Sequence, residues 1–283
     1  MKKTGLILEG GAMRGMFTCG VIDVFMENNI TFDGTIGVSA GAAFGCNYKS
    51  NQIGRAVRYN KNYCNDKRYA SFRSLIKTGD LFGADFCYRE IPEKLDIWDY
   101  EAFEKNPMEF YVTCTDVLTG KPVYHKCTTG RNDDIQWMRA SASMPMVSRV
   151  VEIGDNKLLD GGVADSIPLK YFESIGYNRN VVILTQPLDY IKGKNQALPL
   201  AKIMLRKYPN LIKAMAERHI NYNETTKYIR EKEENGEVFV IRPSEPLNIG
   251  KMEKNPDELE RVYQIGRKTA EQCLEKMNTF LRD

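Results

Sequence analysis

Apolar positions in the first forty residues follow two patterns, a short continuous run and a helical spacing. Residues 4–9 form a run that predicts a buried strand, and a glycine-rich loop follows directly. Apolar residues then recur at helical spacing, at Phe17, Val21, Val24 and Phe25. Residues 32–38 predict the second strand, because the β-branched Ile36 and Val38 favour extended backbone. Two strands joined by one helix imply a parallel pair with a right-handed crossover.

The remainder of the chain continues this mixture. We expect strands over residues 109–115, 122–127, 149–153, 157–159, 180–185 and 238–241. We expect helices over residues 41–49, 133–139 and 256–281, with two more on either side of Pro209. Alternating strands and helices of this kind predict an α/β fold, specifically a three-layer α/β/α arrangement with a mixed, mainly parallel central sheet and a helical C-terminal extension.

Two segments stand apart from this regular pattern. Residues 51–99 are rich in Tyr and Arg without a clear strand, so we expect helices and loops that cover the sheet as a lid or substrate-contacting cap. No internal repeat or low-complexity linker divides the chain. We therefore expect a main unit over residues 1–190 that includes this insertion, and a helical, basic extension over residues 191–283 with one further strand, packed on the same domain.

Charge is distributed unevenly although the net charge is only +3. Between Lys49 and Lys77 there are eight Lys and Arg residues and one acidic residue. Between Ile191 and Lys232 there are ten Lys and Arg residues and three acidic residues. One interpretation is that the cations of both stretches lie on solvent-exposed helix faces. The alternative is a basic face that contacts an anionic phospholipid surface.

The sequence carries no recognisable targeting or membrane-spanning segment. Glu9 interrupts the first apolar run, and the longest charge-free stretch, Gly34 to Tyr48, has 15 residues, short of the roughly 18 that a span needs. Seven cysteines without a C-x-x-C pair suggest neither a disulfide framework nor a zinc site. We expect a cytoplasmic protein that is soluble or at most peripheral to a membrane.

A serine held between two glycines ends the second predicted strand. Gly37-Val38-Ser39-Ala40-Gly41 has the G-x-S-x-G form of a nucleophile elbow. A serine on such a strand-to-helix turn exposes its Oγ at the sheet edge, and the glycines lack the Cβ atoms that would collide there. Since glycine, serine and alanine are common, the pattern alone also fits an ordinary turn.

The glycine loop fits an oxyanion hole better than a phosphate cradle. Met16 and Phe17 stand where a P-loop needs Lys and Ser or Thr, and Ala12 replaces the second glycine of a dinucleotide motif. Nucleotide binding therefore stays a third alternative. Backbone N–H groups at Gly11 and Ala12, ahead of a helix, could instead stabilise an acyl-transfer oxyanion beside Ser39.

A nucleophilic serine needs a general base, and few residues of the chain could serve as one. His125 lies within a predicted hairpin, and His219 lies in a helical stretch, although it preserves the Ser–Asp–His order of a hydrolase triad. Asp160 leaves a predicted strand and precedes Gly161-Gly162, so a carboxylate base and a simple Asp-Gly turn are both open interpretations.

Four segments taken together resemble the ordered motifs of patatin-like phospholipases. They are Gly10 to Gly15, Gly37 to Gly41, Ala140 to Pro145, and Asp160-Gly161-Gly162. The resemblance covers residues 4–168 and the strand near Val181, whereas the last third carries no matching motif. One departure is Ala12, where the family usually has a third glycine.

The resemblance implies lipid acyl-ester hydrolysis of the phospholipase A or lysophospholipase type, without metal or cofactor. Ser39 would be the nucleophile and Asp160 the general base. Gly10, Gly11 and Ala12 would form the oxyanion hole, and the supporting residues would be Arg14, Gly15, Gly37, Gly41, Gly161 and Gly162. Arg14 would hold the loop or touch a headgroup phosphate, while Ser141 and Pro145 would shape the backbone beside the dyad.

The partners implied are a lipid acyl ester and a peripheral contact with an anionic membrane surface, with no nucleic acid. The rival interpretation is a non-catalytic or weakly catalytic membrane-surface or partner-binding module of the same fold. The basic Lys49–Lys77 stretch, the basic C-terminal third and the Ala12 departure favour that rival.

Overall fold

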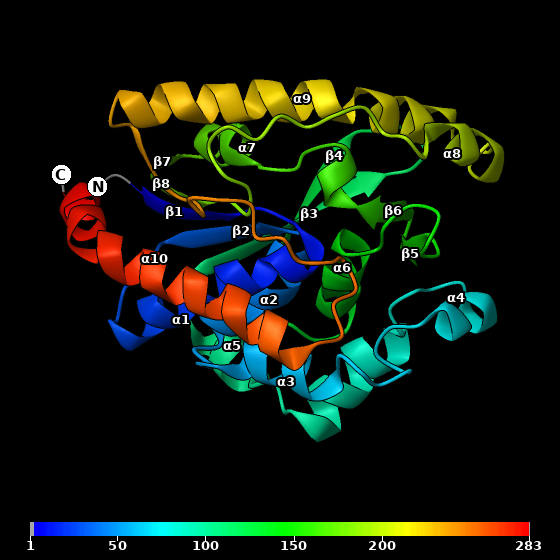
Figure 1. The fold of residues 1–283 in the computed structure, drawn as a ribbon, viewed down its shortest axis with the longest axis horizontal. Coiled ribbons are helices and arrows are strands. Elements are labelled where there is room, and N and C mark those ends of the chain that lie inside the picture. Colours follow the sequence, from blue (N-terminus) through cyan, green and yellow to red (C-terminus); the bar gives the residue numbers. More distant parts are fainter. Residues whose placement is uncertain (1–2, 283) are drawn as a thin grey trace.

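The central feature of the computed structural model, which describes residues 3–282, is an eight-stranded mixed sheet between two layers of helices (Figure 1). The strands are β1 (Lys3–Leu8), β2 (Gly34–Val38), β3 (Glu109–Asp116), β4 (Pro122–Cys127), β5 (Val151–Ile153), β6 (Asn156–Asp160), β7 (Tyr177–Ile183) and β8 (Val238–Ile241). Their order is β5-β6-β3-β2-β1-β7-β8, and β4 pairs with β3. The predicted three-layer α/β/α fold is confirmed.

Helices cover both faces of the sheet. The α-helices are α1 (Gly15–Glu27), α2 (Ala40–Lys49), α3 (Arg55–Tyr63), α4 (Phe72–Thr78), α5 (Tyr100–Lys105), α6 (Asp133–Ser141), α7 (Leu169–Ser174), α8 (Leu198–Met204), α9 (Pro209–Glu234) and α10 (Pro256–Arg282). Side chains alternate along β1, so that Leu6 and Leu8 pack with α1 and α10, whereas Ile7 packs with α7 and α9. The hydrophobic core is therefore divided into two layers, one on each face of the β-sheet.

Short helices of other types complete the fold. They are the 3-10 helices η1 (Ala12–Arg14) and η3 (Gly161–Val163) and the π-helix η2 (Phe86–Leu95). No helix among residues 3–282 is long and apolar enough to cross a membrane.

The C-terminal third contributes to the same sheet and core. Strand β8 pairs in parallel with β7, with Val238 opposite Asn180. Helix α10 crosses α1 in backbone contact: a Cβ on Gly20 would lie 2.1 Å from the Tyr263 carbonyl oxygen, and one on Gly266 would lie 2.0 Å from that of Phe17. Glycine is required at both positions because any side chain would push the helices apart.

Strands β2 and β6 meet end to end along one side of β3. Val38, the last residue of β2, pairs in parallel with Thr113, and Asp160, the last residue of β6, pairs antiparallel with Cys114. Strand β4 pairs with residues 110–115 and so occupies the other side of β3. The two strands run toward each other and deliver their last residues to one point.

The predicted boundaries shift at a few elements. Strand β7 begins at Tyr177 rather than residue 180, and α7 was not predicted because six residues are too few to show a helical period. Residues 51–99 contain α3, α4 and η2, and their only bridge in the described chain joins Ala70 to Phe82. The parallel pairing of β1 with β2 is confirmed.

Candidate active site

Ser39 and Asp160 form a hydrogen-bonded pair at the junction of β2 and β6. The Ser39 Oγ donates to Asp160 Oδ2 at 2.7 Å, and the Gly162 N–H donates to Asp160 Oδ1 at 2.8 Å. Asp160 is only 6% exposed. Ser39 has φ 54°, a conformation that L-residues rarely adopt, so the turn between β2 and α2 is strained.

The glycines around Ser39 are required by close packing. A Cβ on Gly37 would lie 2.5 Å from the Gly41 carbonyl oxygen, and a Cβ on Gly41 would lie 2.4 Å from the Leu8 carbonyl oxygen. The turn between β2 and α2 can therefore form only if both positions lack a side chain.

Ser141 links the serine turn to β3. The Ser39 N–H donates to Ser141 Oγ at 2.9 Å, and the Ser141 hydroxyl donates to the Thr113 carbonyl oxygen at 2.6 Å. Ser141 is fully buried. It therefore acts on the backbone beneath the dyad and has no contact with the Ser39 hydroxyl.

The glycine loop lies beside Ser39, as the parallel pairing predicted. A Cβ on Gly10 would lie 2.9 Å from Ser39 Cβ. The N–H groups of Gly10, Gly11 and Ala12 have no hydrogen-bond acceptor among residues 3–282, whereas the Arg14 N–H donates to the Gly11 carbonyl. Ala12 has φ 50°, so a left-handed conformation is occupied by a residue with a Cβ. Free donors beside Ser39 are what an oxyanion requires.

Burial raises the pKa of Asp160 above its ordinary value, while Arg218 and the hydrogen bonds from Ser39 and Gly162 oppose this shift. A buried carboxylate has lost solvating water, so it accepts a proton more readily. The position combines a basic carboxylate with a hydroxyl proton already directed at it.

The other predicted supporting residues surround this pair. Arg14 lies in η1, and Gly15 begins α1 against the Phe44 ring, which a Cβ would approach to 2.8 Å. Gly161 and Gly162 open η3, and a Cβ on Gly161 would lie 2.0 Å from the Thr113 carbonyl oxygen. The structure therefore brings all the predicted site residues into one region.

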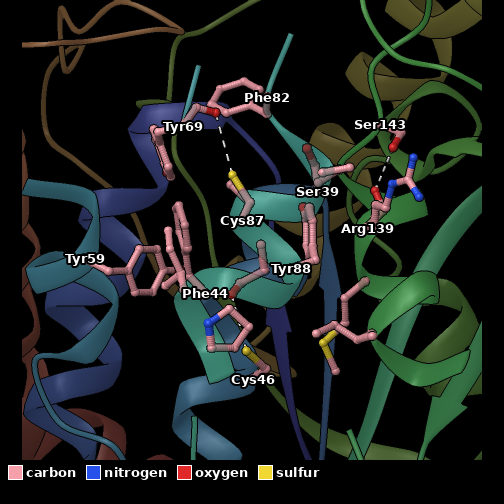
Figure 2. Close-up of a pocket in the computed structure, with 18 of the residues that line it drawn as sticks. Ser39, Phe44, Cys46, Tyr59, Tyr69, Phe82, Cys87, Tyr88, Arg139 and Ser143 are labelled. Atoms are coloured by element: carbon pink, nitrogen blue, oxygen red, sulfur yellow. Dashed lines mark hydrogen bonds between the residues drawn. The ribbon is translucent and has the colours of Figure 1, made fainter. Parts of the chain in front are cut away.

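An apolar cavity of about 130 Å³ reaches Ser39, which is one of its lining residues (Figure 2). Aromatic side chains gather around it, among them Phe44, Tyr59, Tyr69 and Tyr88. The insertion over residues 51–99 supplies much of this wall, including several residues of η2. The cavity suits a flexible hydrocarbon chain.

A larger cavity of about 610 Å³ also reaches Ser39, and we call it the polar cavity because charged side chains line it. Ser39, Ala12 and Met144 line both cavities. The polar cavity also contains Asp160 and several cationic side chains. Ser39 therefore stands where an apolar space joins a charged one.

The two histidines do not contact the dyad. His125 lies on β4, stacks on Trp137 with 4.5 Å between ring centroids, and lines neither cavity. His219 lines the polar cavity, but its Nδ1 lies 3.0 Å from the Ala216 carbonyl oxygen of its own helix. The Ser39 hydroxyl is bonded to Asp160 instead.

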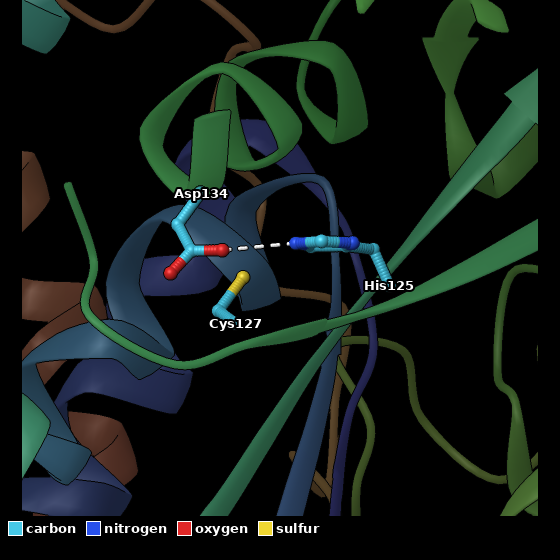
Figure 3. Close-up of side chains that lie close together, drawn as sticks. All are labelled: His125, Cys127 and Asp134. Carbon is cyan, nitrogen blue, oxygen red and sulfur yellow. Dashed lines mark hydrogen bonds and ion pairs between the residues drawn. The ribbon is translucent and has the colours of Figure 1, made fainter. Parts of the chain in front are cut away.

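His125, Cys127 and Asp134 lie close together, and each carries an atom of a kind that can bind a metal (Figure 3). His125 Nε2 lies 2.9 Å from Asp134 Oδ1, while Asp134 Oδ2 accepts N–H bonds from Thr128, Thr129 and Gly130. Burial raises the pKa of the Cys127 thiol well above its ordinary value, which disfavours the thiolate that binds metals. These contacts explain the cluster as a support for the loop at 128–130.

Sequence reasoning missed several residues of the cavity walls. Tyr88 lies on a π-helix that contains Pro92, and this combination has no simple apolar period. Arg218 and Lys192 belong to stretches interpreted as generally basic, with no local signal that they face Ser39. Their arrival at one cavity depends on where α9 and the loop before α8 lie in the folded chain.

Two family models match segments of the chain. A family model described as "Patatin-like phospholipase" matches residues 6–173, and one described as "Domain of unknown function (DUF6363)" matches residues 208–282. The chain is 26% identical over 275 residues to "Uncharacterized protein YjjU" of Escherichia coli (strain K12), covering 94% of this chain and 75% of that protein.

Two further similarities cover nearly all of the chain. It is 23% identical over 298 residues to "Lysophospholipase nte1" of Aspergillus oryzae, which covers 98% of this chain but 18% of that larger protein. The crystal structure of VipD from Legionella pneumophila aligns over 98% of this chain and 67% of that one, with a TM-score of 0.48 and 12% identity.

Proposed function

Since the chain belongs to the patatin-like phospholipase family, we propose that it hydrolyses acyl esters of lipids with Ser39 as nucleophile and Asp160 as general base. The observation that carries this proposal is the 2.7 Å hydrogen bond from Ser39 Oγ to Asp160 Oδ2. Relatives named lysophospholipases support an ester bond in a lipid as the target. An intact, directed dyad argues against the purely non-catalytic alternative.

The first half-reaction transfers the acyl group to the enzyme. Ser39 Oγ attacks the ester carbonyl carbon while its proton passes to Asp160, and the carbonyl oxygen becomes an oxyanion. The N–H groups of Gly10, Gly11 and Ala12 stabilise that oxygen. The carbon–oxygen bond to the alcohol then breaks, and the leaving oxygen takes the proton from Asp160.

The second half-reaction restores the enzyme. Water attacks the carbonyl carbon of the acyl-serine and gives a proton to Asp160. The carbonyl oxygen becomes a second oxyanion in the same hole. When the bond to Ser39 Oγ breaks, that oxygen recovers the proton and the fatty acid is released. One carboxylate thus serves both halves.

The apolar cavity supports a lipid chain as the acyl group. Its wall is mainly aliphatic and aromatic and reaches from Ser39 to the insertion helices. Burying methylene groups there favours long chains, because each contributes about 0.8 kcal/mol. A short-chain ester would forgo that gain.

A fluorophosphonate probe tests the proposed nucleophile without knowledge of the lipid. We expect the label on Ser39, and we expect Ser39→Ala to abolish it. Ser174→Ala is the matched control, because Ser174 is an exposed serine on α7. A label mapped to another residue would overturn the assignment of Ser39.

We also propose that α4 contacts the lipid surface. Phe72 and Ile76 on α4 are 72% and 86% exposed. They accompany Arg73 and Lys77 on a helix that projects from the molecule (Figure 1). Exposed apolar side chains mixed with cations are typical of interfacial helices.

Several other cations of the Lys49–Lys77 stretch already have partners within the protein. Lys49 and Arg55 are buried and donate to backbone carbonyls. Arg58 pairs with Asp96, and Arg68 pairs with Asp66. The membrane-facing interpretation therefore narrows to α4.

A further inference from the structure

The polar cavity beside Ser39 collects positive charge from distant parts of the chain. Its cationic lining residues are Arg14, Lys192, Lys194, Arg218 and Lys251. They come from η1, from the loop between β7 and α8, from α9 and from the loop before α10. None of them forms an ion pair among residues 3–282.

The two carboxylates of the cavity, Glu9 and Asp160, are already engaged. Glu9 accepts the Thr185 N–H at 2.6 Å and the Tyr222 hydroxyl at 2.7 Å. Asp160 accepts bonds from Ser39 and Gly162. Neither carboxylate neutralises the cations through a direct contact, so the cavity holds excess positive charge.

Two of the guanidinium groups have buried atoms without a partner. The Nε atoms of Arg14 and Arg218 are buried and make no hydrogen bond in the described part of the chain. A buried donor without an acceptor is unfavourable, so both atoms are suited to donate to an anion in the cavity. Arg218 also lies next to the dyad, since a Cβ on Gly162 would come within 3.1 Å of its Nη2.

Lys192 is held in place on the same cavity. Its backbone N–H donates to Asn223 Oδ1 at 2.9 Å, and its carbonyl accepts from Asn223 Nδ2 at 3.1 Å. Its Nζ lies 4.2 Å from the centre of the Tyr222 ring. Burial, together with the neighbouring Arg218 and Arg14, lowers the pKa of Lys192 to about 8. An anion in the cavity would stabilise the protonated, charged form of Lys192.

Resting on the proposed hydrolysis at Ser39, we propose that this cavity binds the phosphate of the substrate's headgroup, and that the substrates are acyl esters of glycerol phosphates with net negative headgroups. Guanidinium and ammonium groups give phosphate oxygens charge-assisted hydrogen bonds. Because Ser39 lines both cavities, a carbonyl placed there would leave the acyl chain in one and the phosphate in the other. A choline ammonium would face like charges.

This assignment gives the C-terminal third a role in selectivity. Arg218 and Lys251 both lie in the segment matched by the domain of unknown function, residues 208–282. That segment adds cations to a site whose nucleophile and base come from residues 6–173.

Headgroup selectivity provides the test. Fatty acid release is measured from lauroyl monoglyceride, lauroyl lysophosphatidylglycerol and lauroyl lysophosphatidylcholine, presented in neutral detergent micelles. We expect kcat/KM for the anionic lipid to exceed that for the choline lipid by about tenfold or more, the change given by one charge-assisted hydrogen bond.

Variants then separate headgroup binding from effects on the dyad. Arg218→Gln and Lys192→Gln should each lower the ratio of anionic to neutral kcat/KM by about 10- to 100-fold. The ratio cancels any change at Asp160, which both substrates share. Lys213→Gln, an exposed lysine of α9, is the matched control and should keep the wild-type ratio.

Free phosphates distinguish a headgroup subsite from a separate anion site. Glycerol 3-phosphate should compete with the anionic substrate, and Lys192→Gln should weaken this inhibition. Inorganic phosphate that inhibits as strongly, combined with equal turnover of all three lipids, would overturn the headgroup subsite. Unchanged ratios in both variants would also overturn it while leaving ester hydrolysis intact.

A failure of the proposed function would look different. No ester would be hydrolysed and Ser39 would not react with the fluorophosphonate. In that event glycerol 3-phosphate is titrated calorimetrically into the wild-type protein and Lys192→Gln. Binding that the variant loses would support the phosphate site, and no binding would overturn it.

Discussion

The hydroxyl of Ser39 lies 2.7 Å from Asp160 Oδ2, although 121 residues separate the two in the chain. They meet because β2 and β6 run toward each other along one side of β3 and end opposite Thr113 and Cys114. The dyad is therefore positioned by hydrogen-bonded strands instead of by mobile loops, which favours the fixed geometry that proton transfer needs.

The dyad predicts which substitutions stop turnover. Asp160→Asn should lower kcat by at least about 10³-fold, because an amide cannot accept the Ser39 proton. His125→Gln combined with His219→Gln should cost less than about tenfold, since neither ring contacts Ser39 or Asp160. The measurement is p-nitrophenyl ester hydrolysis. A dead histidine variant beside an active Asp160→Asn would show that the base was misassigned.

The elevated pKa of Asp160 predicts the acid side of the pH profile. The base works as a carboxylate, so kcat/KM should rise as pH increases through a pKa above the ordinary value of about 3.9. Arg218→Gln removes a charge that lowers this pKa, so the acid limb should move to higher pH. Initial rates across pH 3 to 8, roughly the range where carboxyl and imidazole groups titrate, give both curves. A step that disappears in His219→Gln would contradict the carboxylate base.

Ala12 predicts a stabilising substitution at the active site. With φ 50°, an alanine there costs about 1–2 kcal/mol that glycine avoids, so Ala12→Gly should raise the free energy of unfolding by about 1 kcal/mol. The backbone N–H remains, and activity should be retained. Ala216→Gly, inside α9, is the control of opposite sign and should cost about 1 kcal/mol. Urea unfolding measures both, and a destabilised Ala12→Gly variant would refute the strain argument.

The exposed face of α4 predicts a membrane phenotype. Phe72→Ser combined with Ile76→Ser should reduce sedimentation with anionic vesicles, because the two most exposed apolar side chains of this helix are lost. Hydrolysis of a water-soluble ester should stay the same, since neither residue lines a cavity. Vesicle binding equal to that of the wild type would exclude α4 as the contact.

The close crossing of α1 and α10 predicts that a larger residue in place of a crossing glycine destabilises the protein. Gly266→Ala should lower the free energy of unfolding by about 1–3 kcal/mol, because its Cβ would overlap the Phe17 carbonyl oxygen. Gly250→Ala is the control, with only a Glu253 side-chain atom nearby at 3.9 Å. Equal stability of the two variants would mean that the helices can separate at little cost.

The sequence predicted the elements that carry local signals. Ile36 and Val38 marked a buried strand, and the glycines around Ser39 and after Asp160 marked turns that need close packing. Arg218 and Lys192 could not be placed at the site, because their convergence depends on how α9 lies over the sheet. The π-helix at 86–95 was not predicted either, since its period matches neither a strand nor an α-helix.

The reciprocal glycines Gly20 and Gly266 also join the two segments that the family models match. One glycine belongs to the segment matched at residues 6–173 and the other to the segment matched at 208–282, yet each accommodates the other's backbone. A chimera that took its last third from a relative with a larger residue at the crossing would carry a mismatched core. To preserve this crossing, the two segments have to be exchanged together.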